Sequence, residues 1–197
     1  NYLNQMHRLR ATVFGSRLEW DVTITEQGER DQYDDLRPTY ILVISAGHKV
    51  AGCARLLPAS GPTMLERTFP QLLERGSLDA HAAVVESSRF CVDTSLAAGR
   101  GGRSLHQATL TMFAGIIEWS MANGYTGIVT ATDLRFERIL KRAGWPLRRL
   151  GEPVAVGNTI AVAGSLPADR ASFEQVCPPG YRSIIEHDRT GPLRSAA

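Results

Sequence analysis

Two hydrophobic periods alternate along this chain, one with helical spacing and one typical of buried strands. The first apolar residues recur every three or four positions and predict an amphipathic helix over residues 3–15, and the polar stretch at 16–38 predicts a long loop. Further helices are predicted at residues 68–75, 104–123, 136–142 and 169–176. Strands are predicted at residues 40–44, 50–57, 83–92, 127–132 and 159–165.

The order of these elements predicts an α/β fold in a single domain spanning residues 1–197. The first two strands, joined by Ala46-Gly47-His48, predict an antiparallel hairpin. The strand at 83–92, the helix after it and the strand at 127–132 predict a βαβ crossover, which requires two parallel strands. The sheet is therefore expected to be mixed and twisted, and the tail at 178–197 carries no clear pattern.

Composition excludes several classes of protein. With 22 Lys+Arg against 20 Asp+Glu, the net charge of +2 argues against nucleic-acid binding, which relies on excess basic charge. No apolar run approaches the roughly 20 residues of a membrane span, and the first residues lack the pattern of a signal peptide. Cys53, Cys91 and Cys177 form no CxxC motif and the histidines show no ligand spacing, so neither disulfides nor a metal site are indicated. We expect a soluble, cytoplasmic protein.

The balanced total hides an uneven distribution of charge. Seven acids and one arginine lie between Glu19 and Asp35, while Arg55, Glu86 and Arg89 interrupt apolar strand runs. One interpretation is a solvated acidic loop with strand residues that face water. The other is a carboxylate–guanidinium network that lines a cleft and binds a zwitterion, since charges are rarely buried unless paired and arginine can hold a carboxylate by two bonds. Charges at three separate strand positions favour the network.

A Gly/Arg-rich turn precedes the helix at 104–123. Ser104 and Gln107 have the spacing of a capping box, and the free N–H groups of a helix N-terminus form a ready anion site. The glycines therefore indicate either a phosphate-binding loop or simply a turn. A mixed sheet with such a loop after its central strand resembles the GNAT N-acyltransferase fold, in which this loop holds phosphates.

Motifs spread over roughly residues 5–165 resemble the LuxI-type acyl-homoserine lactone (autoinducer) synthases. They are Leu9–Phe14, Arg17–Trp20, Glu29–Asp34, Arg55–Pro58, Met64-Leu65 with Phe69, and Glu86–Phe90. The resemblance implies an acyltransferase that uses S-adenosylmethionine as its amine substrate and an acyl thioester as donor, with no cofactor. Because family members carry a further N-terminal stretch with an edge strand, it also implies that this strand is missing before Asn1.

The resemblance also assigns the residues of an S-adenosylmethionine site. They are Arg10, Phe14, Trp20, Asp31, Asp34 and Arg89, with Glu29 and Arg55 in the surrounding electrostatic network. A substrate that carries a sulfonium, an ammonium and a carboxylate requires acids, an aromatic face and an arginine. Trp20 is expected either to lie against the sulfonium by cation–π attraction or to be an ordinary core or lid residue.

By the same resemblance, Glu86 and Ser88 are the candidate catalytic residues. The amine must lose a proton before it attacks the thioester, and these side chains would accept that proton or orient a water. Alternatively, Glu86 only pairs with Arg10 or Arg55 and holds the pocket in shape. After acylation the substrate carboxylate attacks the γ-carbon, methylthioadenosine leaves and the lactone ring closes, a step that depends on positioning.

The acyl chain requires an apolar pocket and the donor requires a docking site. The expected pocket residues are Phe69, Met112, Ile116, Val129 and Thr130, and a threonine at the place of Thr130 is associated in the family with 3-oxo chains. Thr130 is equally readable as an ordinary β-branched strand residue. The expected docking residues are Arg100, Gly101, Arg103 and Ser104 for phosphopantetheine or coenzyme A, and Arg135, Arg138 and Arg142 for an acidic acyl carrier protein.

The three basic residues of the docking set lie at i, i+3 and i+7 of a predicted helix, so a solvated helix face is the alternative interpretation. The sequence thus leaves acyl carrier protein and acyl-CoA open as donors. Two rival functions also remain at this level, an ordinary N-acetyltransferase acting on another amine and a non-catalytic S-adenosylmethionine-binding domain. Release of methylthioadenosine with formation of an acylated product separates all three.

Overall fold

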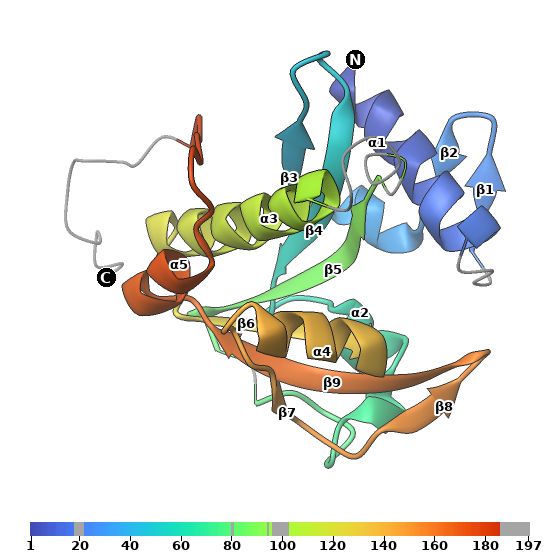
Figure 1. Cartoon of the computed structure of the whole chain (residues 1–197). Coiled ribbons are helices and arrows are strands. Elements are labelled where there is room, and N and C mark those ends of the chain that lie inside the picture. Colours follow the sequence, from blue (N-terminus) through green and yellow to red (C-terminus); the bar gives the residue numbers. More distant parts are fainter. Residues whose placement is uncertain (18–21, 80, 94, 96–102, 186–197) are drawn as a thin grey trace, which may run out of the picture.

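A computed structural model describes residues 1–17, 22–79, 81–93, 95 and 103–185. Its main sheet has seven strands in the order β3-β4-β5-β6-β9-β7, with β8 paired to β9 (Figure 1). The strands are β3 (Thr39–Ile44), β4 (Val50–Pro58), β5 (Val84–Val92), β6 (Gly127–Asp133), β7 (Arg148–Arg149), β8 (Val154–Val156) and β9 (Thr159–Pro167). Only β5 and β6 run parallel among these described pairs, so the predicted mixed α/β sheet is confirmed.

The helices follow the hydrophobic periods with some differences. The α-helices are α1 (Tyr2–Arg10), α2 (Met64–Arg67), α3 (Arg103–Ala122), α4 (Leu134–Arg142) and α5 (Arg170–Val176). The first predicted helix continues past α1 as a π-helical turn, η1 (Ala11–Arg17). The predicted helix at 68–75 is wrong, because α2 ends before Pro70, which lacks an N–H, and a 3-10 turn, η3 (Pro70–Leu72), follows.

The predicted loop at 16–38 contains short ordered elements. A two-stranded ribbon forms from β1 (Ile24–Thr25) and β2 (Gly28–Glu29), followed by a 3-10 helix, η2 (Gln32–Leu36). Gly28 has φ +117°, and a side chain there would collide with the backbone of His7 in α1. This close approach of β2 to α1 brings Glu29 beside the last turn of the helix.

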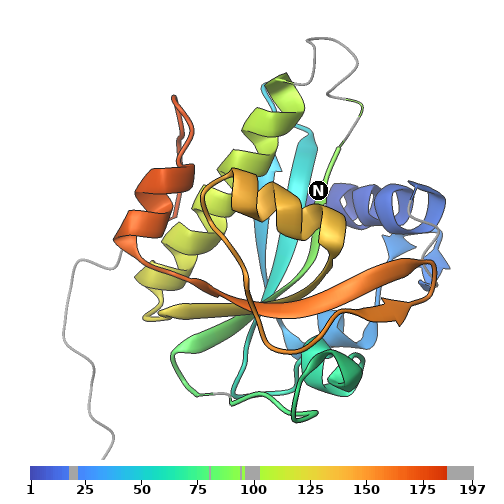
Figure 2. The same cartoon turned by 60° about the horizontal axis from the view of Figure 1, so that its bottom comes forward.

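The two faces of the central strand β4 have different chemistry. Ala54 and Leu56 join the apolar core under α3, whereas Cys53, Arg55 and Leu57 face α1, η2 and α2. Helix α3 therefore covers one face of the sheet, and the N-terminal elements cover the other (Figure 2). Both faces of β4 are buried, which explains its continuous apolar run.

Strands β5 and β6 pair over only three positions, from Val84–Gly127 to Glu86–Val129. Beyond that point the two ribbons diverge, and α4 lies across the opening (Figure 1). The pairing between β5 and β6 therefore ends at Glu86, and the two strands separate beyond this residue.

A β-bulge reverses the alternation of β5. Arg55 pairs with Ser88 and Cys53 with Cys91, so β5 has one residue more than β4 between these pairs. The bulge contains Arg89, whose φ of +53° is unusual for a residue other than glycine. Because of the extra residue, Ser88 and Arg89 are consecutive and yet both turn toward Arg55 and the N-terminal elements.

The described part of the chain has no helix with the length and apolarity needed to cross a membrane. Cys53 and Cys91 face each other across the two strands as free thiols, with 3.3 Å between their sulfur atoms.

Candidate functional site

The first component of the site is an ionic network between α1 and the β4–β5 face. Arg10, at the end of α1, donates through Nη1 and Nη2 to the two carboxylate oxygens of Asp34, at 2.8 and 2.9 Å. Its Nε donates to Glu29 at 2.5 Å. The Arg10 side chain is directed inward by the helix geometry, because Met6 and Arg10 are four residues apart and lie on the same buried face of α1.

Arg55 and Arg89 connect this network to the sheet. Arg55 binds Asp31 through both terminal nitrogens, at 2.5 and 3.0 Å, and donates through Nε to Ser88 Oγ at 3.1 Å. Arg89 contacts Glu29 at 3.1 Å and Asp31 at 2.8 Å, and its guanidinium lies over the ring of Phe14. Three arginines thus balance three carboxylates, so the ion pairs of the predicted network are present and these side chains do not form a solvated loop.

Exposure divides these charged side chains into two groups. The side chains of Arg10, Glu29 and Arg55 are 0% exposed and that of Asp34 is 1% exposed. Asp31 and Arg89 retain 17% and 9%. In this structure, therefore, Asp31 and Arg89 are the network members that keep some exposed side-chain surface, and the other four are almost completely buried.

Asp34 is the most heavily bonded carboxylate of the network. It accepts hydrogen bonds from Arg10, Arg55, the Tyr40 hydroxyl at 2.6 Å and the Asp31 amide at 2.9 Å. Burial alone would raise the pKa of Asp34, but the bonds from Arg10 and Tyr40 outweigh it and hold this pKa well below the usual range. Burial and the bond to Asp34 raise the pKa of Tyr40. Asp34 therefore remains charged in the folded protein.

Glu86 lies on the same face of β5 but outside the ion pairs. Its carboxylate accepts hydrogen bonds from the amides of Met64 and Leu65, at 2.9 and 2.6 Å, at the first turn of α2. The ion pairs of the described residues do not include Glu86, so it forms no direct pair with Arg10 or Arg55, although the charge of Arg55 acts to lower its pKa. Burial raises the pKa of Glu86, and the two amide bonds offset this only in part.

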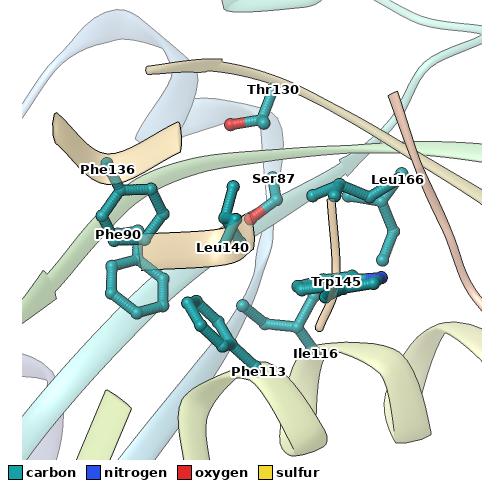
Figure 3. A pocket seen from close by; sticks show the side chains of 10 residues that line it. Ser87, Phe90, Phe113, Ile116, Thr130, Phe136, Leu140, Trp145 and Leu166 are labelled. Atoms are coloured by element: carbon teal, nitrogen blue, oxygen red, sulfur yellow. The ribbon is translucent and has the colours of Figure 1, made fainter. Parts of the chain in front are cut away.

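The second component is an apolar pocket on the opposite face of β5. Pairing with β6 ends at Glu86 and Val129, and the next residues, Ser87 and Thr130, line this pocket (Figure 3). Aromatic and aliphatic side chains from α3, α4, the turn after α4 and the neighbouring strands complete it: Phe90, Phe113, Ile116, Ile128, Phe136, Leu140, Trp145 and Leu166. The hydroxyl groups of Ser87 and Thr130 are polar points on an otherwise apolar wall.

Two of the five predicted pocket residues, Ile116 and Thr130, line this pocket, and the other three do not. Val129 faces the opposite side of β6, with Leu65 and Leu72, because successive strand residues alternate. Met112 is fully buried against Gly52, and Phe69 packs near α2.

Other predicted site residues are only partly described. Trp20, Arg100 and Gly101 lie outside the described residues; Arg103 and Ser104 begin α3, but their side chains also lie outside that description. Gln107, the partner in the predicted capping box, donates its side-chain amide to the Pro179 carbonyl. Arg135, Arg138 and Arg142 are all exposed on α4. Within the described residues, no cluster of His, Cys, Asp or Glu could hold a metal ion.

Several contributors to the site were not predicted. Tyr40 joins the network because it pairs with Arg55 across β3 and β4, a register that the sequence does not specify. The sequence does carry a signal for the start of α2, where Glu86 binds, since Thr63 and Glu66 have the spacing of a helix N-terminus. In the structure the Thr63 hydroxyl accepts from the Glu66 amide. The aromatic wall of the pocket comes from four separate segments, so no local signal marks it.

Comparisons with known proteins extend this picture. Residues 1–176 match the family model described as autoinducer synthase. The chain is 76% identical, over its full length and 93% of the relative, to the acyl-homoserine-lactone synthase of Rhizobium radiobacter. The crystal structure of the AHL synthase LasI superposes with a TM-score of 0.79 at 32% identity, covering 89% of this chain and 87% of that one. The CoA-dependent synthase BjaI, solved with SAM and isopentyl-CoA, gives 0.78 at 25% identity, covering 89% and 80%.

Proposed function

The chain belongs to the autoinducer synthase family, and from this premise we propose that it joins S-adenosylmethionine to an acyl thioester where its ionic network meets its apolar pocket. It is an acyl-homoserine-lactone synthase with the GNAT-like fold. The observation that carries the proposed location is the split between β5 and β6. Asp31 and Arg89 lie on one side of β5, and the pocket begins at Ser87 on the other.

The charged groups of S-adenosylmethionine are complementary to the two network side chains that keep exposed surface, Asp31 and Arg89. The Asp31 carboxylate suits the sulfonium or ammonium of S-adenosylmethionine, and the Arg89 guanidinium suits its carboxylate. The Arg89 guanidinium packs over the ring of Phe14, with the guanidinium carbon 5.5 Å from the ring centre. The buried members Arg10, Glu29, Asp34 and Arg55 act by holding these two groups, rather than by touching substrate.

The reaction then proceeds in two displacements. The deprotonated amine attacks the thioester carbonyl, an amide bond forms and the thiol leaves. The substrate carboxylate next attacks the γ-carbon, the bond from that carbon to sulfur breaks, and methylthioadenosine departs. We propose that Glu86 takes up the amine proton, with the Ser88 hydroxyl orienting an intervening water. Its raised pKa makes the Glu86 carboxylate a stronger base than an exposed one.

The donor-side assignments are part of the same proposal. The apolar pocket, whose volume of about 20 Å³ requires its walls to move apart, takes the acyl chain. The Thr130 hydroxyl, whose contact found among the described residues is a long one of 3.4 Å to the Ala131 carbonyl, offers a hydrogen bond to a 3-oxo group. The thioester arrives on an acyl carrier protein that docks on the exposed arginines of α4. Free acyl-CoA, held by its phosphates at the start of α3, is the second candidate donor, and BjaI supports it as a CoA-dependent relative.

The function is tested by incubating the purified chain with S-adenosylmethionine and a panel of acyl-carrier-protein and acyl-CoA donors. Mass spectrometry is expected to detect acyl-homoserine lactone and methylthioadenosine in equal amounts. Binding of S-adenosylmethionine without methylthioadenosine would indicate a non-catalytic domain. An acylated product on another amine would indicate an ordinary N-acetyltransferase.

Replacing Asp31 by asparagine should raise KM for S-adenosylmethionine by about 10- to 100-fold, because hydrogen bonds to charged groups are worth roughly 1.5–3 kcal/mol. Asp31 caps η2 by accepting from the Tyr33 amide, and asparagine retains that cap, so the substitution removes the charge together with its ion pairs to Arg55 and Arg89 but not the cap. Steady-state kinetics measure the effect. Asp35→Asn, at an exposed carboxylate paired with Arg30, is the control. Equal KM values in the two variants would remove Asp31 from the substrate site.

Reversing Arg135 and Arg138 to glutamate should raise KM for carrier-bound donor several-fold and leave KM for S-adenosylmethionine unchanged. An acidic carrier protein is attracted over about 8 Å at physiological salt, so added salt should weaken the wild type in the same way. Arg75→Glu with Arg182→Glu makes the same change in charge at exposed positions away from α4. If both double variants behave alike, the α4 face is only solvated and acyl-CoA becomes the preferred donor.

A further inference from the structure

Met64 touches both the candidate base and the exposed end of the ionic network. Its amide donates to Glu86 Oε2 at 2.9 Å. Its sulfur atom accepts from Arg89 Nη1 at 3.4 Å and lies 3.7 Å from Arg55 Nη2. The side chain is buried beside Tyr33 and Leu57, so its position is fixed by packing at the start of α2.

The sulfur gives one amino group of Arg89 a different environment from the rest of that guanidinium. Nε and Nη2 of Arg89 contact the carboxylates of Glu29 and Asp31. For Nη1, the acceptor found among the described residues is the neutral thioether of Met64. A thioether is a weak acceptor, whereas a carboxylate forms a short, charge-assisted bond with guanidinium. Nη1 is therefore oriented but remains available to a stronger acceptor.

We infer that Met64 is a positioning residue, whose sulfur holds Arg89 Nη1 ready for the carboxylate of the amine substrate. The inference deepens the proposed function and rests on it. A side chain without an acceptor at position 64 would leave Nη1 without a bond in the unliganded protein, although the carboxylates on Nε and Nη2 still hold the planar guanidinium. A strong acceptor there would compete with the substrate carboxylate. Methionine satisfies both requirements, because it bonds weakly and adds no charge to a balanced network.

The kinetic test compares two substitutions at this position. Met64→Leu, which removes the sulfur and nearly conserves volume, should raise KM for S-adenosylmethionine about three- to tenfold. Met64→Gln, which introduces a strong acceptor, should raise this KM further. The kcat and the donor KM should stay within about twofold of wild type in the leucine variant. Met121→Leu, at a half-buried methionine of α3, is the matched control.

A spectroscopic test reports on the contact itself. The chain contains four methionines, so methyl-¹³C-methionine labelling gives a simple spectrum in which Met64→Leu identifies the Met64 signal. Arg89→Lys should shift that signal, and so should unlabelled S-adenosylmethionine added to the wild type. If Met64 were only a packing residue, its substitution would lower the stability of the protein without a selective change in the KM for S-adenosylmethionine.

The outcomes separate this inference from the proposed function. Wild-type release of methylthioadenosine together with an unchanged KM in Met64→Leu would overturn the inference alone. Proportional increases in both KM values with a fall in stability would also overturn it, because they indicate packing. A wild type that does not turn over S-adenosylmethionine would overturn the proposed function and the inference together.

Discussion

Replacing Arg10 by alanine is expected to lower the free energy of unfolding by about 3–5 kcal/mol, because it leaves buried carboxylates without their partner. Arg10 has no exposed side-chain surface, and its guanidinium binds both Glu29 and Asp34. Arg10 is the main group that lowers the pKa of Asp34, so its removal leaves the cost of burying this carboxylate uncompensated, whether Asp34 stays charged or takes up a proton. Urea denaturation followed by circular dichroism measures the change.

Arg30→Ala is the matched control for this prediction. Arg30 pairs with Asp35 at 3.0 Å, but both side chains are well exposed, and such surface pairs are worth about 0–1 kcal/mol. The two variants remove the same chemical group from the chain. Equal unfolding midpoints for Arg10→Ala and Arg30→Ala would show that the buried ionic network does not stabilise the fold.

Replacing Glu86 by glutamine is expected to lower kcat by about 10²–10⁴-fold, the range typical for loss of a general base. Only the deprotonated carboxylate can accept the amine proton. Because burial raises the pKa of Glu86, wild-type kcat should fall on acidification at a higher pH than an ordinary glutamate would give. The pH profile of kcat for wild type and variant measures both effects, and the acidic limb should be absent from the variant.

Glu86 also organises α2 through two amides, so a control must separate the two roles. Thr63→Ala removes the hydroxyl that caps α2 at Glu66 and costs about 0.5–2 kcal/mol of helix stability, while Glu86 is left intact. Thr63→Ala is therefore expected to retain most of kcat. If it loses as much kcat as Glu86→Gln, Glu86 acts by ordering α2 and not as a base.

The sequence predicted the elements of the sheet well, because each long apolar run is a local property. The hairpin of β3 and β4 and the βαβ crossover through α3 follow from hydrophobic period and turn residues alone. The short strands β7 and β8 were not predicted, since two or three residues are too few to show the alternation of apolar and polar positions that marks a strand. For the site, charges inside apolar runs predicted a network at Arg55 and Arg89, because burial of a charge requires a partner.

The sequence by itself determined which segments are strands and which charged residues need a partner if they are buried, since both follow from the cost of burying polar groups. Only the tertiary structure decided which pairs form and which of their side chains keep exposed surface. The bulge at Arg89 turns two consecutive residues of β5 to one face, against the alternation that a strand pattern implies. The divergence of β5 and β6 likewise depends on how α4 and the aromatic side chains fill the space between them. Such features arise from contacts between segments far apart in the chain, and no local pattern encodes them.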